Sequence, residues 1–258
     1  MPFFAAPSSR RVVRKEKRTI GWLPGPQLVQ QMKYLGRTIF RMIRRGESGV
    51  VLKEFRDRLW SNETSLVLRC DLRQHHHVPA AKIPLRLRPM ELGDFPSIVA
   101  ERPRRLPVLL DNIPGGYVAV TETGELAFMI WLVFSWEWPR FKQHFKGEIA
   151  EPLKADECIL EFAYTFEKFR GLGVMSAAMV MITEEAVKLQ PSVRWAYNYI
   201  RLGNEASLKG CRNAGFRPYL MREERWRAMR LRQKFVPLRP GSPFPFETIH
   251  NRAAASGF

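Results

Sequence analysis

Cysteine is scarce in this chain of 258 residues. Cys70, Cys158 and Cys211 are the whole complement, and they are widely spaced with no CxxC pair. An odd number of distant cysteines argues against a disulfide framework. The pattern therefore favours a reducing compartment such as the cytosol.

Long hydrophobic runs are also missing. The most apolar stretch, LAFMIWLVFSW at Leu126–Trp136, is too short to cross a bilayer and is typical of a buried strand. The first residues, MPFFAAPSSRRVVRKEKR, place apolar residues before the charges, which is the reverse of a signal peptide. A cytoplasmic location is expected, with peripheral attachment to a membrane left open.

Histidine offers no metal site. Three of the five histidines, His75, His76 and His77, are adjacent. Neighbouring side chains do not converge on one ion in a helix or a strand, and zinc ligands are spaced differently. We expect no bound metal.

Acidic residues are few, with 25 against 42 lysines and arginines, for a formal net charge of +17. Such an excess favours an acidic partner, which includes nucleic acid, an anionic membrane surface and a phosphorylated ligand. An enzyme with an arginine-rich surface would have the same charge. Hydrophobic residues at 45% and charged residues at 26% nevertheless predict a globular core.

Residues 1–81 are interpreted as a basic N-terminal extension. Within it, Leu28, Met32, Leu35, Ile39 and Met42 recur at steps of three and four, which predicts one apolar face of a helix. Lysine and arginine fill much of the remaining surface. Such a helix either lies on a membrane or covers its own domain.

Residues 82–238 are predicted to form one mixed α/β domain, followed by an irregular tail at 239–258. In order, the patterns indicate a strand, a helix, a hairpin at 115–134, a strand, a helix, a strand, a helix and two final strands. We expect a single, mostly antiparallel sheet flanked by helices.

The stretch EFAYTFEKFRGLGVMSAAMVMITEEA, residues 161–186, places two glycines where a strand turns into a helix. Backbone without a Cβ can approach a ligand closely, and the first N–H groups of a helix attract anions. Arg170 would add a full positive charge. The alternative is a turn in which the glycines serve only to allow positive φ. GxG alone is a weak motif and does not distinguish the two interpretations.

The sequence here resembles the GCN5-related N-acetyltransferases, which bind acetyl-CoA. Arg170 to Gly173 resembles the R/Q-x-x-G-x-G/A signature of that family, and NEASLKGCRNAGF at 204–216 resembles its late helix. IPLRLRPMELGDFPSI at 83–98 resembles its opening strand and helix. The likeness covers about Lys82 to Leu238. Met175 departs from it, since Gly or Ala is usual there.

This resemblance implies an acyl-CoA-dependent N-acyltransferase that moves acetyl from acetyl-CoA to an unidentified amine by direct attack. A kinked strand before the signature would leave N–H groups for the pantetheine arm and the acetyl oxygen, and the glycine turn would hold the diphosphate. The implied cofactor-binding residues are Tyr164, Thr165, Phe166, Arg170, Gly171, Leu172, Gly173, Val174, Met175, Ser176 and Asn204.

The same resemblance suggests acid–base residues. A catalytic glutamate is often on this strand, which implies Glu161 first and Glu157 second, although both are also able to pair with arginines. The late helix of the family offers a tyrosine where this chain has Cys211, interpreted as a proton donor or, preferably, as a core residue. Tyr197, Tyr199 and Tyr219 are possible substitutes. Asn204 would contact the cofactor, cap its own helix, or do both.

Two other functions remain open. A module with this fold but without turnover would use the positive charge to bind nucleic acid or a protein. Alternatively, Met175 with Trp131, Trp136 and Trp138 would shape a tunnel for a longer acyl donor, unless these side chains belong to the core.

Overall fold

The computed structural model describes residues 49, 56–74, 80–102, 115–142 and 152–247. The chain divides into two units between Phe55 and Arg56, and the elements described below belong to the second unit. The predicted N-terminal helix and the three adjacent histidines lie outside the described residues.

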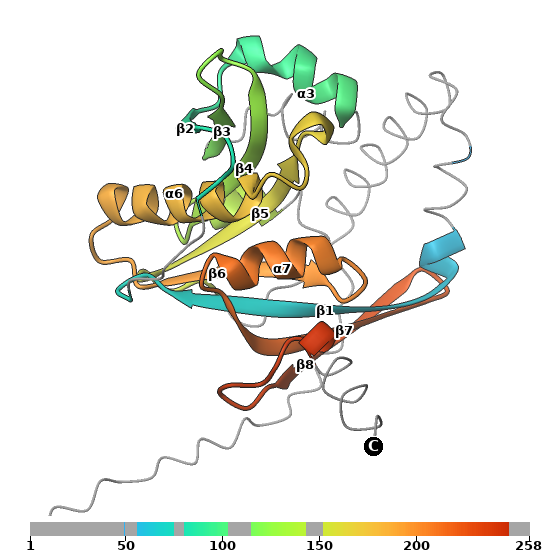
Figure 1. The fold of residues 1–258 in the computed structure, drawn as a ribbon. Helices are drawn as coiled ribbons and strands as arrows, with labels where there is room; N and C mark the ends of the chain where they lie inside the picture. The colour runs from blue at the N-terminus through green and yellow to red at the C-terminus, as the bar shows by residue number, and fades with distance from the viewer. Residues whose placement is uncertain (1–48, 50–55, 75–79, 103–114, 143–151, 248–258) are drawn as a thin grey trace, which may run out of the picture. The chain divides into compact units, whose positions relative to one another are not determined.

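One eight-stranded sheet organises this unit, with the order β2-β3-β4-β5-β6-β1-β7-β8 (Figure 1). Seven neighbouring strand pairs hold it together, and β5 with β6 is the parallel one among antiparallel pairs. The strands are β1 (Trp60–Asp71), β2 (Arg86–Pro89), β3 (Gly116–Val120), β4 (Leu126–Phe134), β5 (Glu157–Thr165), β6 (Trp195–Arg201), β7 (Arg217–Arg227) and β8 (Arg230–Pro237).

Helices lie between the strands along the chain. They are η1 (Leu92–Asp94), α3 (Phe95–Glu101), α5 (Trp138–Phe141), η4 (Glu167–Phe169), α6 (Val174–Leu189) and α7 (Glu205–Asn213). The long helix α6 packs on β4 and β5 and against α7. From residue 82 onward, the predicted order of elements and the mixed α/β class are therefore confirmed.

The centre of the sheet is apolar. In β4, every residue from Ala127 to Phe134 is buried, as expected for the LAFMIWLVF run. Because a strand presents alternate residues to opposite faces, such a run requires cover on both sides of the sheet. Trp131 and Trp138 belong to this core, whereas Trp136 is 59% exposed.

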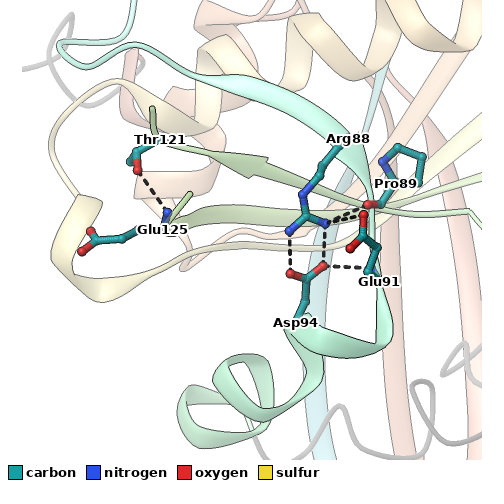
Figure 2. Close-up of polar contacts among 6 residues, drawn as sticks. All are labelled: Arg88, Pro89, Glu91, Asp94, Thr121 and Glu125. Atoms are coloured by element: carbon teal, nitrogen blue, oxygen red, sulfur yellow. Dashed lines mark hydrogen bonds and ion pairs between the residues drawn. The ribbon is translucent and has the colours of Figure 1, made fainter. Parts of the chain in front are cut away.

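The link from β2 to α3 is fixed by a charged fork (Figure 2). Arg88 donates two hydrogen bonds to the Asp94 carboxylate, at 2.8 and 2.7 Å, and the Glu91 N–H donates a third at 2.8 Å. Burial opposes ionisation of Asp94, but these donors outweigh it and hold the pKa of Asp94 below its ordinary value. Asp94 thus holds the start of the helix that the sequence predicts there.

Strand β1 corrects the domain boundary expected at residue 82. It lies inside the sheet, paired antiparallel with β6 on one side and with β7 on the other. Its side chains at 65–68 are almost fully buried. The apolar pattern of residues 65–70 predicts a strand at most. Nothing in this segment indicates that its partner strands, β6 and β7, lie more than a hundred residues further along the chain.

The C-terminal tail packs on the domain at Phe244 and Phe246. Phe244 and Phe246 are buried and stack on each other, with ring centroids 5.4 Å apart. Glu247 accepts a hydrogen bond from Arg212 of α7 at 3.0 Å. Sequence reasoning did not anticipate these apolar anchors, because two phenylalanines among prolines show no periodicity.

Candidate active site

Strands β5 and β6 separate partway along their length. They pair in parallel from Glu157 with Trp195 to Leu160 with Asn198. Beyond that point β5 stays paired with β4 as far as Thr165, while β6 stays paired with β1 as far as Arg201. Two parallel strands that part inside one sheet leave backbone groups on their facing edges without a ladder partner.

A bulge marks the place where β5 turns away. Phe162 has φ of 59°, and the four residues of β5 from Glu161 to Tyr164 lie opposite the three of β4 from Trp131 to Met129. Positive φ is rare for an aromatic residue and points to a constrained position. The expected kink before the signature is therefore present, with its centre at Phe162.

The backbone donors after the bulge are not equivalent. The Phe166 N–H donates to Ala127 O at 3.0 Å, so it is engaged with β4 and unavailable to a ligand. Because N–H groups alternate in direction along a strand, that of Thr165 points to the other side, toward the gap. The expectation for Phe166 is thus wrong, and its side chain is core, at 4% exposed.

The glycine turn places two residues with left-handed backbone directly before helix α6. Gly171 and Gly173 have φ of 75° and 77°, and a Cβ at Gly171 would meet no atom within 4 Å. The first hydrogen bond of α6 runs from Ala177 N–H to Gly173 O. The N–H groups of Val174, Met175 and Ser176 therefore have no acceptor within the helix.

Residues 80–82, at the end of the expected N-terminal extension, lie against this turn, a contact that sequence reasoning missed. Lys82 N–H donates to Leu172 O at 2.9 Å. A Cβ at Gly173 would lie 3.5 Å from Ala81 Cα and 3.6 Å from Ala80 O. These are ordinary van der Waals distances, so glycine is favoured at position 173 by its left-handed backbone and not by lack of space.

Helix α6 is held against α7 by the next two residues. The Ser176 hydroxyl donates to Gly210 O at 3.1 Å, and Met175 Sδ lies 2.7 Å from where a Cβ at Gly210 would be. The absence of a side chain at Gly210 makes room for Met175. This unusual signature residue therefore fills the contact between helices, and it does not support a wider acyl tunnel.

Arg170 is engaged at the edge of the turn. It donates to Glu167 Oε1 at 3.0 Å and to the Tyr164 hydroxyl oxygen at 3.0 Å, and the Tyr164 hydroxyl donates to Glu101 Oε2 at 2.9 Å. Its side chain is half exposed. Binding of an anion by Arg170 would require exchange of these contacts.

The two candidate carboxylates differ in their surroundings. Glu157 is buried at the paired end of β5, where it accepts from Lys154 N–H at 2.9 Å and from the Tyr197 hydroxyl at 3.1 Å. Glu161 is half-buried and is the first residue after the pairing with β6 ends. Tyr199 directly follows Asn198, the last residue of β6 that pairs with β5, and the Arg222 guanidinium lies 4.9 Å from the centroid of its ring.

Of the other proposed acids, Cys211 is excluded from contact with a substrate. It is fully buried, and burial raises the pKa of its thiol. The Tyr197 hydroxyl donates a hydrogen bond to Glu157. Tyr219 packs on Tyr197 at 5.9 Å between centroids and carries the Arg69 guanidinium 4.2 Å above its ring. The core interpretation of Cys211 is therefore correct.

Asn204 caps helix α7, since its Oδ1 accepts from Ser207 N–H at 3.3 Å. It also lies beside an open cavity of about 690 Å³, lined by Asn62, Glu63, Thr64, Arg201, Leu202, Gly203 and Asn204. Sequence reasoning did not anticipate that β1 would supply one wall of this cavity.

No family model matches the sequence, and no curated protein matches it. The structure is similar to a GNAT-family acetyltransferase from Colwellia psychrerythraea, with 14% identity over 69% of this chain and a TM-score of 0.43. A tandem GNAT protein of the clavulanic acid pathway has 16% identity over 69% and a TM-score of 0.43. A GCN5-related N-acetyltransferase from Sphaerobacter thermophilus has 14% over 74% and 0.42.

All three neighbours carry the name of the GCN5-related family. It is the same family that the sequence motifs resemble. The chain spans 57%, 55% and 58% of the lengths of these three proteins. At such identities and TM-scores, the likeness does not transfer an activity or a substrate.

Among the described residues, no helix is both long enough and apolar enough to cross a membrane.

Proposed function

We propose that this chain is an acyl-CoA-dependent N-acyltransferase of the GCN5-related type, transferring acetyl from acetyl-CoA to an amine. The observation that carries the proposal is the parting of β5 from β6 at Leu160 and Asn198, directly before a glycine bend at a helix start. A linear molecule with amide groups and a diphosphate fits such a gap.

The residues present suit that molecule. The Thr165 N–H faces the gap, and pantetheine offers amide oxygens to accept from it. The N–H groups at the start of α6, next to two glycines with positive φ, suit a diphosphate. The chemistry supplied by the bound thioester is an activated acetyl carbon, and this chain supplies orientation and proton transfer.

In the proposed reaction, the amine nitrogen bonds to the acetyl carbon as the carbon–sulfur bond breaks. Glu161 accepts the proton that the ammonium must lose, because it stands where the strands part. Tyr199, the first residue of β6 after its pairing with β5 ends, returns a proton to the leaving thiolate. The family has a tyrosine as proton donor at the position of Cys211. The role given to Tyr199 follows the expectation that Tyr197, Tyr199 or Tyr219 replaces that donor.

Binding is tested by titration calorimetry with CoA on the full chain and on Gly171→Ala. The matched control is Gly124→Ala, because both glycines have positive φ and open space around a new Cβ. Both substitutions strain the backbone, but only that at Gly171 is expected to weaken CoA binding. Absence of CoA binding by the folded wild-type chain would refute the proposal.

Turnover is tested by thiol release from acetyl-CoA with a panel of amines. Glu161→Gln is expected to reduce kcat by about a hundredfold or more, the usual contribution of a general base, without changing CoA affinity. Tyr199→Phe should reduce kcat less than Glu161→Gln does. Equal loss of activity in Glu157→Gln and Glu161→Gln would contradict the assignment of the base.

A further inference from the structure

The end of the sheet at the β7–β8 turn gathers exposed apolar side chains. We define the hairpin tip as Leu59, Trp60, Ala228 and Met229. Leu59, Trp60 and Met229 are 42%, 69% and 43% exposed. They make up half of the six exposed large hydrophobic residues in the described part of the chain. Concentration at one place distinguishes them from scattered surface residues, which need no explanation.

The backbone fixes these side chains together. Ala228 N–H donates to Leu59 O at 2.8 Å, and Met229 N–H donates to Arg58 O at 2.9 Å. The turn is therefore docked on the residues that lead into β1. Leu59 and Met229 are neighbours although 170 positions separate them in the sequence.

Trp60 is held in a defined orientation. The Arg227 guanidinium lies 3.6 Å from the centroid of its ring. Arg227 itself donates to Ser61 O at 3.0 Å, to Trp226 O at 2.6 Å and to Asn62 Oδ1 at 2.9 Å. An indole fixed in this way, and still largely exposed, pays little entropy on contact with a partner.

The turn residues themselves are unusual. Ala228 and Met229 connect the paired Arg227 and Arg230, and both have positive φ, 47° and 66°. A two-residue turn of this kind favours Asn-Gly, because a bulky side chain at positive φ is strained. A methionine at this position does not stabilise the turn. Its exposed side chain is consistent with contact to a partner molecule.

Positive charge surrounds the tip. The basic margin consists of Arg56, Arg225, Arg230, Arg232 and Lys234, all exposed. Of these, Arg230, Arg232 and Lys234 have no ion pair with any residue that the structure describes. On β7 and β8 the register places Arg225 beside Arg232, and Glu223 beside Lys234.

We propose that the hairpin tip and its basic margin dock on the surface of an anionic phospholipid bilayer. Tryptophan and other apolar side chains enter the boundary between headgroups and acyl chains, while lysine and arginine attract anionic headgroups. A nucleic acid would use the same cations and stack on Trp60, but it would leave Leu59 and Met229 unexplained. The inference does not depend on acyl transfer.

The test is co-flotation of the full chain with phosphatidylcholine vesicles, with and without phosphatidylglycerol. Wild type is expected to bind the anionic vesicles, and Trp60→Ser to bind them about tenfold more weakly, the typical effect of removing one buried apolar side chain. Trp136→Ser is the matched control, because Trp136 is 59% exposed elsewhere on the surface. It should bind like wild type.

A second variant separates binding from folding. The double substitution Ala228→Asn with Met229→Gly gives the turn its preferred residues, so the melting temperature should stay unchanged or rise while vesicle binding falls. Unchanged vesicle binding in both this variant and Trp60→Ser would overturn the proposal. So would tight binding to a single-stranded oligonucleotide that Trp60→Ser weakens, with no binding to vesicles.

Discussion

The two halves of the sheet are built differently. From β2 to β5, strands adjacent in the sheet are also consecutive in the chain, and β4 is buried along almost its whole length. From β6 to β8, a strand from the far N-terminal side is inserted between later ones, and β8 exposes a positive side chain at every second position from Arg230 to Lys234. The first half supplies most of the apolar core, whereas the second presents charge and depends on a distant strand.

The largest expected effect follows from that insertion. A chain that begins at residue 82 lacks β1, and so leaves β6 and β7 without their common neighbour. We expect it to lose cooperative unfolding, while a chain that begins at Arg56 retains it. Urea denaturation followed by circular dichroism makes the comparison. A cooperative transition in the shorter chain would mean that β1 is dispensable.

The next effect belongs to the apolar half. Phe128 of β4 is fully buried, and Phe128→Ala should lower the free energy of unfolding by about 3–5 kcal/mol through lost burial and a cavity. Arg232→Gln, on the exposed edge strand, is the comparison and should change it by less than about 0.5 kcal/mol. The free energies of unfolding are measured by urea denaturation. Similar losses of stability in the two variants would show that the two halves of the sheet do not differ in their contribution to the core.

A smaller effect tests the fork of Figure 2. Asp94→Asn should cost about 2 kcal/mol near neutral pH, because it weakens a partly buried ion pair. The folded-state pKa of Asp94 lies below its ordinary value, so its contribution is present above about pH 4 and is lost as the pH falls through that lower pKa. Stability curves of wild type and variant should therefore converge in acid, and a constant difference would contradict this.

The smallest effect lies at the paired end of β5. Tyr197→Phe removes the hydroxyl that donates to Glu157 and should cost about 1 kcal/mol. Burial and the charge of Glu157 raise the pKa of Tyr197. Its contribution is therefore complete below the ordinary tyrosine pKa of about 10 and declines above it. Wild type should lose stability in alkali more steeply than the variant, as thermal melts at several pH values would detect.

Much of the candidate site was accessible to sequence reasoning. The glycine bend and the kinked strand before it rest on residues within one segment, and they agree with the bulge at Phe162 and the parting of the strands. The wrong assignment of Phe166 as a donor has a plain cause. Which edge a backbone N–H faces depends on the register with β4, and a bulge of one residue reverses it.

Local pattern determined most of the elements from Lys82 to Leu238, because helix and strand periodicity and glycine turns are properties of neighbouring residues. Tertiary structure alone decided that β1 enters the sheet between β6 and β7, that Gly210 makes room for Met175, and that Leu59 lies beside Met229. Each of these joins residues that are distant in the chain. Contacts of that kind depend on the packing of completed elements and leave no periodic trace in the sequence.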